Sequence, residues 1–100
     1  MMVYDSLRHE TVLFGGSDGT KNLGDTWVWD GTNWTWVSGS DTANQPGTYG
    51  TKGVAAPGNV PGARSGSVSW RDSAGNFLLF GGTLDPGVLG QAYFNDLWKW

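Results

Sequence analysis

The feature that most constrains this chain is an internal repeat. Residues 12–16 read Val-Leu-Phe-Gly-Gly and residues 78–82 read Leu-Leu-Phe-Gly-Gly, at an offset of 66. Residues 24–29 and 95–100 share the pattern Asp-x-Trp-x-Trp, at an offset of 71. The change of offset predicts a five-residue insertion between the two motifs, within residues 83–94. Self-similarity of this kind is typical of folds built from stacked units, in which insertions fall in loops.

Each repeat unit predicts a series of short strands. The offset of 66 also aligns Met2 with Val68 and Tyr4 with Trp70, so a first strand precedes the Phe-Gly-Gly motif in both units. The 17 glycines disfavour long helices and the 7 tryptophans favour strands, which predicts an all-β fold of antiparallel meanders. A Gly-Gly pair is expected to end the second strand of each unit. The predicted strands are residues 1–5, 10–14, 25–29 and 34–37, then 66–70, 76–80 and 96–100.

These motifs resemble the kelch repeat, which combines Pro-x-x-Arg-Ser-Gly, an apolar-Gly-Gly segment and Asn-Asp-Leu-Trp in that order. The second unit carries all three, at residues 61–66, 80–82 and 95–98, and the first carries 14–16, Asp25 and Trp27. The resemblance is to bacterial kelch arrays, in the superfamily that includes the galactose oxidase propeller. It implies a kelch-type β-propeller segment of two antiparallel blades, with four plus three strands. The implied parts are a first blade (1–38), an inter-blade loop (39–60) and a second blade lacking its fourth strand (61–100).

Two blades are too few to close a propeller, since kelch propellers generally hold six to eight. Trp27 and Trp29 share one face of their strand, as do Trp34 and Trp36, and such faces need a neighbouring blade to exclude water. The first unit lacks the Pro-x-x-Arg motif and the second lacks a fourth strand, which favours a fragment of a longer propeller chain. The alternative is a ring of three or four identical chains joined head to tail. The open edge of residues 96–100 is expected to invite strand pairing.

Composition excludes several classes of partner. The formal net charge is −3, and the 6 basic residues are scattered, so no basic stripe predicts a nucleic-acid partner. No apolar run approaches the ~20 residues of a membrane span, and the sequence has no cysteine for a disulfide or a thiolate metal site. These observations do not decide the cellular compartment of the protein. The family resemblance alone favours an extracellular or cell-surface location.

The sequence predicts no catalytic centre, cofactor or metal. The only histidine, His9, lies in a predicted turn, and no Gly-x-Ser-x-Gly motif is present. With one histidine and no cysteine, the copper site of galactose oxidase is not carried over. Asp25 and Asp96 recur at the same repeat position and Asp30 lies in a turn, so all three are interpreted as structural. Arg64 is expected to satisfy carbonyl groups or an aspartate of its own unit.

The loops are the predicted seat of function, because loops on a rigid scaffold carry binding residues more often than strands do. Residues 38–60 form a connection longer than the ~12–15 residues at which unstructured loops become uncommon. The alternative for this segment is a lid packed over the fold. The candidate ligand-binding residues lie in this loop and in residues 83–93: Asp41, Asn44, Tyr49, Lys52, Asp85 and Tyr93.

Three functions remain in competition at this point. The leading hypothesis is a scaffold that binds a protein or a carbohydrate ligand and is not an enzyme. The first alternative is a fragment of a propeller enzyme, such as a carbohydrate oxidase or lyase, with its catalytic residues in other blades. The second alternative is a structural unit that assembles itself into a closed propeller.

Overall fold

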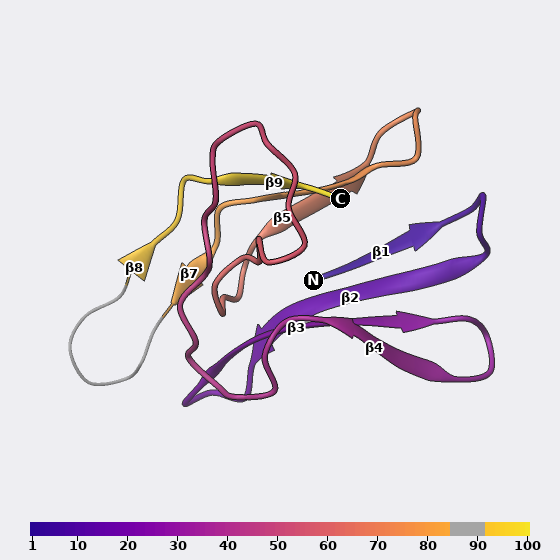
Figure 1. The fold of residues 1–100 in the computed structure, drawn as a ribbon. Coiled ribbons are helices and arrows are strands. Elements are labelled where there is room, and N and C mark those ends of the chain that lie inside the picture. The colour runs from indigo at the N-terminus through magenta and orange to yellow at the C-terminus, as the bar shows by residue number, and fades with distance from the viewer. Residues whose placement is uncertain (85–91) are drawn as a thin grey trace.

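Two antiparallel sheets make up most of the computed structural model, which describes residues 1–84 and 92–100 (Figure 1). The first sheet has the order β1-β2-β3-β4, built from β1 (Met2–Asp5), β2 (Glu10–Ser17), β3 (Asn22–Trp29) and β4 (Trp34–Ser38). The second sheet has the order β5-β6-β9, built from β5 (Val68–Arg71), β6 (Phe77–Phe80) and β9 (Leu97–Lys99). A short pair joins β7 (Thr83–Leu84) to β8 (Ala92–Tyr93). The predicted all-β fold, with antiparallel sheets of four and three strands, is confirmed.

The strands differ from the prediction at the Gly-Gly pairs. In the first sheet the ladder continues through Gly15 and Gly16, so β2 runs on to Ser17 and pairs there with the early residues of β3. Gly15 and Gly16 have φ of 59° and 125°, and the register shifts at this point, which marks a bulge rather than a strand end. The prediction that this glycine pair ends the strand is therefore wrong for the first unit.

The β7–β8 pair, which the sequence did not predict as strands, is the counterpart of that continuation. Thr83 pairs with Tyr93 as Ser17 pairs with Asn22, at the same offsets of 66 and 71 that relate the sequence motifs. Next to this pair, the Phe94 amide donates a hydrogen bond to Gly82 oxygen at 2.9 Å. The predicted insertion thus falls beyond the matched ends of two strands, at the connection between β7 and β8.

The alignment of the first strands at an offset of 66 is corrected by the register. Met2 lies opposite Leu13, but Val68 lies opposite Phe80, which is the repeat of Phe14. The residue opposite Phe14 is Met1, whose carbonyl accepts the Phe14 amide at 2.9 Å. Met1 is therefore the structural counterpart of Val68, and the offset of these strands is 67. The cause is the turn, since Asp72 and Asn76, the counterparts of Asp5 and Glu10, are joined by three residues (73–75) where the first unit has four (6–9).

Each sheet has two faces, because side chains alternate along a strand and paired residues share a side. We call face A of the first sheet the side that carries Val12, Phe14 and Val28, and face B the opposite side, with the four tryptophans of β3 and β4. The repeat transfers both names to the second sheet. Its face A carries Val68, Trp70, Leu78, Phe80 and Leu97, and its face B carries Ser69, Phe77, Leu79, Trp98 and Trp100.

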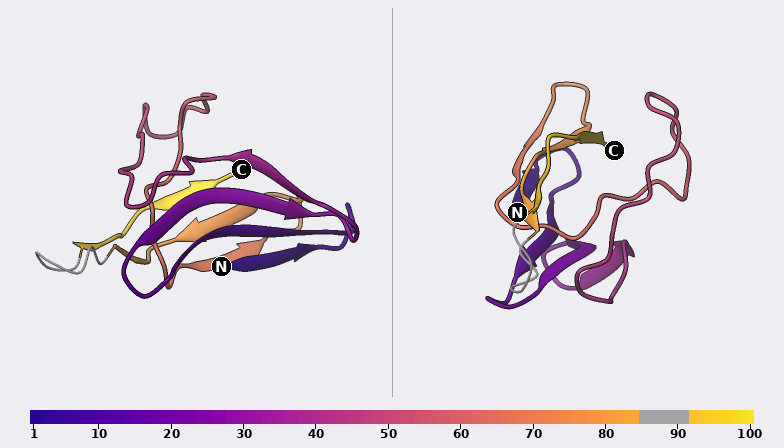
Figure 2. Two further views of the ribbon diagram at one scale, coloured as in Figure 1. Left: turned by 90° about the horizontal axis from the view of Figure 1, so that it is seen from below. Right: turned by 90° about the vertical axis from the view of Figure 1, so that its left-hand side faces the viewer.

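Face A of the first sheet packs against face B of the second. Phe14 is buried, and its ring lies 6.2 Å from the ring of Trp100. Leu79 on face B has no exposed surface. Fully burying a side chain of the size of Phe14 stabilises the fold by about 1.5–3 kcal/mol. Figure 2 shows the two sheets turned so that β1 runs beside β5, the edge where Asp5 and Arg71 form an ion pair of 3.1 Å.

A buried segment, residues 61–64, ties the sheets together. The Arg64 amide donates to Leu23 oxygen at 3.0 Å, and Arg64 oxygen accepts the Gly16 amide at 3.0 Å, so the segment is bonded to the bulged end of β2 and β3. A side chain at Gly15 would place its Cβ 2.7 Å from Arg64 oxygen. Gly15 is therefore needed both for its positive φ and for this close approach.

Candidate functional site

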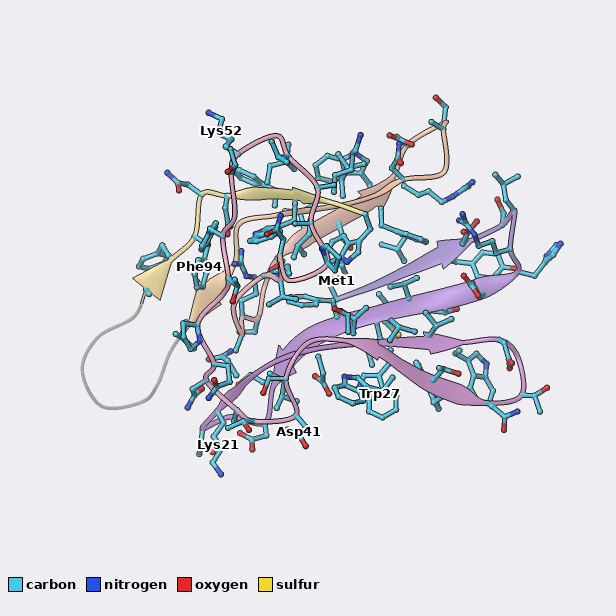
Figure 3. The ribbon with its side chains drawn as sticks, viewed as in Figure 1. Met1, Lys21, Trp27, Asp41, Lys52 and Phe94 are labelled. Atoms are coloured by element: carbon cyan, nitrogen blue, oxygen red, sulfur yellow. The ribbon has the colours of Figure 1, made fainter. Side chains whose placement is uncertain are left out.

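A groove of about 870 Å³ opens between the outer edge of β9 and residues 49–56 of the long loop. We call it the β9 groove. Its lining residues are Tyr49, Gly50, Thr51, Lys52, Gly53, Val54, Ala55, Ala56, Asn59, Pro61 and residues 95–100. Figure 3 shows Lys52 on this loop above β9, with its side chain directed away from the sheets. Protein pockets that hold ligands have volumes in this range.

The long loop is closed at its base by backbone bonds. The Thr48 amide donates to Val60 oxygen at 2.9 Å, and the Val60 amide donates to Thr48 oxygen at 3.1 Å. Inside the loop, Asn59 Nδ2 donates to Val54 oxygen at 3.1 Å. The loop rises away from both sheets (Figure 2), so it forms one wall of a groove and does not lie flat as a lid.

Asp96 is the centre of the polar contacts at this site. Its carboxylate accepts two bonds from the Arg64 guanidinium, at 2.5 and 2.9 Å, and Oδ2 also accepts Trp98 Nε1 at 2.7 Å and the Tyr49 hydroxyl at 2.5 Å. Burial alone raises the pKa of Asp96, but the hydrogen bonds from Arg64, Tyr49 and Trp98 outweigh it and hold the pKa well below the ordinary value of 3.8. The carboxylate is an anion at neutral pH and a fixed acceptor.

Tyr49 links the loop to β9. Its ring centroid lies 5.1 Å from that of Trp98, and its hydroxyl donates to Asp96. Burial, followed by the hydrogen bond to the Asp96 carboxylate, raises the pKa of Tyr49 above 10.0. The phenol therefore stays protonated, and the ring is a fixed aromatic wall of the groove.

Arg64 fulfils the structural role that the sequence predicted. Nε donates to Gly62 oxygen at 2.9 Å and Nη1 donates to Gly81 oxygen at 3.0 Å, in addition to the pair with Asp96. The guanidinium carbon also lies 3.8 Å from the centre of the Phe94 ring, a cation–π contact. The side chain is fully buried and satisfied. It positions Asp96 and offers no surface to a ligand.

The structural interpretation of the other aspartates is confirmed. Asp25 Oδ2 accepts Trp27 Nε1 at 2.7 Å, the same contact that Asp96 makes with Trp98. Asp30 Oδ1 accepts the amides of residues 32 and 33 at 2.8 and 2.7 Å, and these bonds lower its pKa. Both carboxylates serve the local backbone or a neighbouring indole.

The structure separates the predicted ligand-binding residues into different regions. Tyr49 and Lys52 line the β9 groove. Asn44 has φ of 58°, and its side-chain oxygen and its amide both bond to the backbone of Asn22, at 2.8 Å. Asp41 is exposed and lies far from Lys52 (Figure 3). Tyr93 is 76% exposed on β8 and does not line the groove, and Asp85 lies outside the described residues.

Several groove residues were assigned only to the repeat by the sequence. The sequence assigns residues 97–100 to a strand with packing side chains, and it assigns Asp96 a structural role. The available signal was the absence of a fourth strand in the second unit, which leaves the edge of β9 without a partner strand among the described residues. That signal identifies the edge but not the loop that faces it.

The described part of the chain contains no group of three or more side chains able to hold a metal ion together. Nor does it form any helix with the length and apolar character that a bilayer crossing requires. His9 lies 3.5 Å from the Tyr4 hydroxyl in an exposed turn, far in sequence from the groove residues. The groove thus offers aromatic walls, an open strand edge and fixed polar groups, which are the components of a binding surface.

Compared with models of protein families, with curated proteins and with solved structures, the chain has no match in any of the three.

Proposed function

We propose that the chain is a kelch-type β-propeller segment that acts as a scaffold for a protein or carbohydrate ligand, with the β9 groove as its binding site. The observation that carries this proposal is the head-to-tail packing of the two sheets. Face A of one repeat meets face B of the next, so the same contact can be repeated around a ring. Binding, rather than catalysis, fits the Asp96 carboxylate, which is held by hydrogen bonds from Arg64, Tyr49 and Trp98.

The two outward faces are complementary in the way a continuing array requires. Phe80 is the repeat of Phe14 on face A, and it is exposed where Phe14 is buried against Trp100. Trp29 is the repeat of Trp100 on face B and lies on the opposite outward side. The large side chains exposed on these two faces are Met2, Tyr4, Trp34 and Trp36 on one, and Val68, Trp70, Phe80 and Leu97 on the other. Covering them would contribute about 25 cal/mol for each Å² of apolar surface removed from water.

The same faces favour a second candidate, a unit that closes its own ring from three or four copies. Phe80 of one copy would then meet Trp29 of the next. A covalent continuation of the propeller would cover the same faces with further blades. Light scattering separates these two: three or four chains in one particle support the self-assembled ring, and a monomer with exposed indoles supports blades supplied by a longer chain.

The binding proposal is tested by presenting the chain to a glycan array and a peptide array. A ligand of the β9 groove is expected to lose at least about tenfold in affinity for Tyr49→Ala, which removes one aromatic wall. The matched control is Tyr93→Ala, which removes the same side chain outside the groove and is expected to bind as the wild type does. Equal binding by both variants would place the ligand elsewhere, and a chain that binds neither array would not be a binding scaffold.

A further inference from the structure

The outer edge of β9 presents backbone groups that face the groove. The Trp100 amide donates to the backbone carbonyl of Phe77 in β6 at 2.9 Å, and the Trp100 carbonyl accepts the Phe77 amide at 3.3 Å. The backbone carbonyl of Asp96 accepts the Gly81 amide at 3.1 Å. In an antiparallel ladder, alternate residues bond to opposite sides. Trp98 therefore bonds toward β6 with Trp100 and Asp96. The amide and carbonyl groups of Leu97 and Lys99 point the other way, into the β9 groove.

The first sheet shows what occupies the same edge there. β4 pairs with β3 so that Trp36 lies opposite Trp27, Thr35 opposite Val28 and Trp34 opposite Trp29. The rings of Trp29 and Trp34 are 5.4 Å apart. At the offset of 71, Trp27, Val28 and Trp29 become Trp98, Lys99 and Trp100. An equivalent strand would place its aromatic residues opposite Trp98 and Trp100 and its middle residue opposite Lys99.

A cavity of about 490 Å³ next to Trp100 can receive such an aromatic side chain. It lies between the sheets and is lined mainly by apolar groups, including Val12, Phe14, Val28, Phe77 and Trp100. Side chains opposite Trp100 project on face B, and in the second sheet face B is the side turned toward this cavity. Ala56 and Asn59 line both the cavity and the groove, so the two spaces adjoin.

We propose that the β9 groove binds an extended peptide segment as an added antiparallel strand, with the pattern aromatic-x-aromatic. The middle residue exchanges two backbone hydrogen bonds with Lys99, one aromatic side chain packs on Trp98, and the other enters the cavity beside Trp100. Residues 49–56 form the opposite wall. This proposal rests on the β9 groove being the binding site, and it selects peptide over carbohydrate because an open strand edge matches a peptide backbone.

The probe is a synthetic peptide with the sequence of residues 31–38, Gly-Thr-Asn-Trp-Thr-Trp-Val-Ser, added to the whole chain. Calorimetry is expected to give a dissociation constant on the order of tens of micromolar. In ¹⁵N spectra, the amides of Leu97 and Lys99 are expected to shift and to exchange more slowly with solvent. A constant weaker than about 1 mM, or shifts that leave these two amides unchanged, would overturn the proposal.

Two N-methylated peptides give a control that leaves the protein unaltered. Methylation of the Thr35 nitrogen removes the donor that faces Lys99, and it is expected to weaken binding about tenfold or more. Methylation of the Trp36 nitrogen alters a group that faces away from β9 and is expected to cost about twofold at most. Equal losses for the two peptides would show that the peptide does not add as a strand in this register.

The protein side is tested with two tryptophans of similar exposure, Trp100 at 41% and Trp70 at 43%. Trp100→Ala is expected to abolish peptide binding, and Trp70→Ala, on face A of β5, is expected to leave it unchanged. A dimer formed without peptide, with the Leu97 and Lys99 amides already protected, would mean that a second copy occupies the edge and would overturn the proposal. If the peptide fails while a glycan binds in a Tyr49-dependent manner, strand addition is wrong and the binding function stands; if neither binds, both fall.

Discussion

β3 and β9 carry the same Asp-x-Trp-x-Trp pattern but have different neighbours along their outer edges. β4 covers the edge of β3, and Asp25 there accepts one bond from Trp27. The edge of β9 faces a loop, and Asp96 accepts bonds from Arg64 and Tyr49 as well as from Trp98. The comparison teaches that the repeat specifies the strand and its indole contact. What lies beside the strand is specified by segments outside the matched motifs.

The largest effect is expected from Arg64→Met. This change leaves the Asp96 carboxylate without its cation and Gly62 oxygen without the Arg64 donor, while Gly81 oxygen keeps only the Ser67 hydroxyl. Removing one partner of a buried pair of this kind costs about 3–5 kcal/mol. Urea unfolding measures the free energy. Lys21→Met is the control, because it removes an exposed cation from the turn between β2 and β3 and is expected to change stability by less than about 0.5 kcal/mol. A similarly small loss of stability for Arg64→Met would show that Arg64 does not hold the two sheets together.

Next in size is the difference between Gly15→Ala and Gly81→Ala, the same repeat position in the two sheets. Both glycines have positive φ, 59° and 68°, so both variants carry a strain of about 1 kcal/mol. Only at Gly15 does the added Cβ come within 3.0 Å of neighbouring backbone oxygens, whereas at Gly81 the nearest atom is 3.3 Å away. Gly15→Ala is expected to destabilise by about 2 kcal/mol more than Gly81→Ala. Equal thermal and urea midpoints would contradict the close contact with residue 64.

Lowering the pH is expected to reduce the stability that the hydrogen bonds of Asp96 provide, by less than either of the two substitutions above. Because the folded pKa of Asp96 is lowered, its contribution to stability is present above the ordinary value of 3.8 and is lost as pH falls below it toward the folded pKa. The contribution is on the order of 1 kcal/mol, since the carboxylate is partly exposed and solvent screens it. The stability difference between wild type and Asp96→Asn, measured by urea unfolding, is expected to stay constant from pH 7 to about pH 4 and to shrink below that. A difference that grows in acid would reverse the sign of this linkage.

The strands of the two larger sheets and the role of Arg64 could be predicted because they depend on motifs that occur twice or on local chemistry, whereas the β7–β8 pair and the continuation of β2 to Ser17 could not. The offset of the first strand could not, since the turn at 73–75 is one residue shorter than the turn at 6–9, and this shifts the register without changing any matched motif. The contact between Tyr49 and Asp96 joins residues 47 positions apart, and one of them lies in a loop that has no repeat to compare with. Asn44 is predicted to bind a ligand because it lies in the long loop, whereas its amide and side chain bond to Asn22.

The smallest effect is expected from Tyr49→Phe, which keeps the aromatic wall and removes only the hydroxyl bonded to Asp96. One hydrogen bond to a partly exposed carboxylate contributes about 0.5–1.5 kcal/mol, and its loss raises the pKa of Asp96 because the anion loses a donor. Urea unfolding and an NMR titration of the Asp96 carboxyl carbon measure the two changes together. Tyr4→Phe is the control, since its hydroxyl lies 3.5 Å from His9 in an exposed turn and its removal is expected to leave Asp96 unaffected. A Tyr49→Phe variant that leaves the Asp96 titration unchanged would show that the loop is not bonded to β9, and β9 would then be as open on its outer edge as an isolated strand.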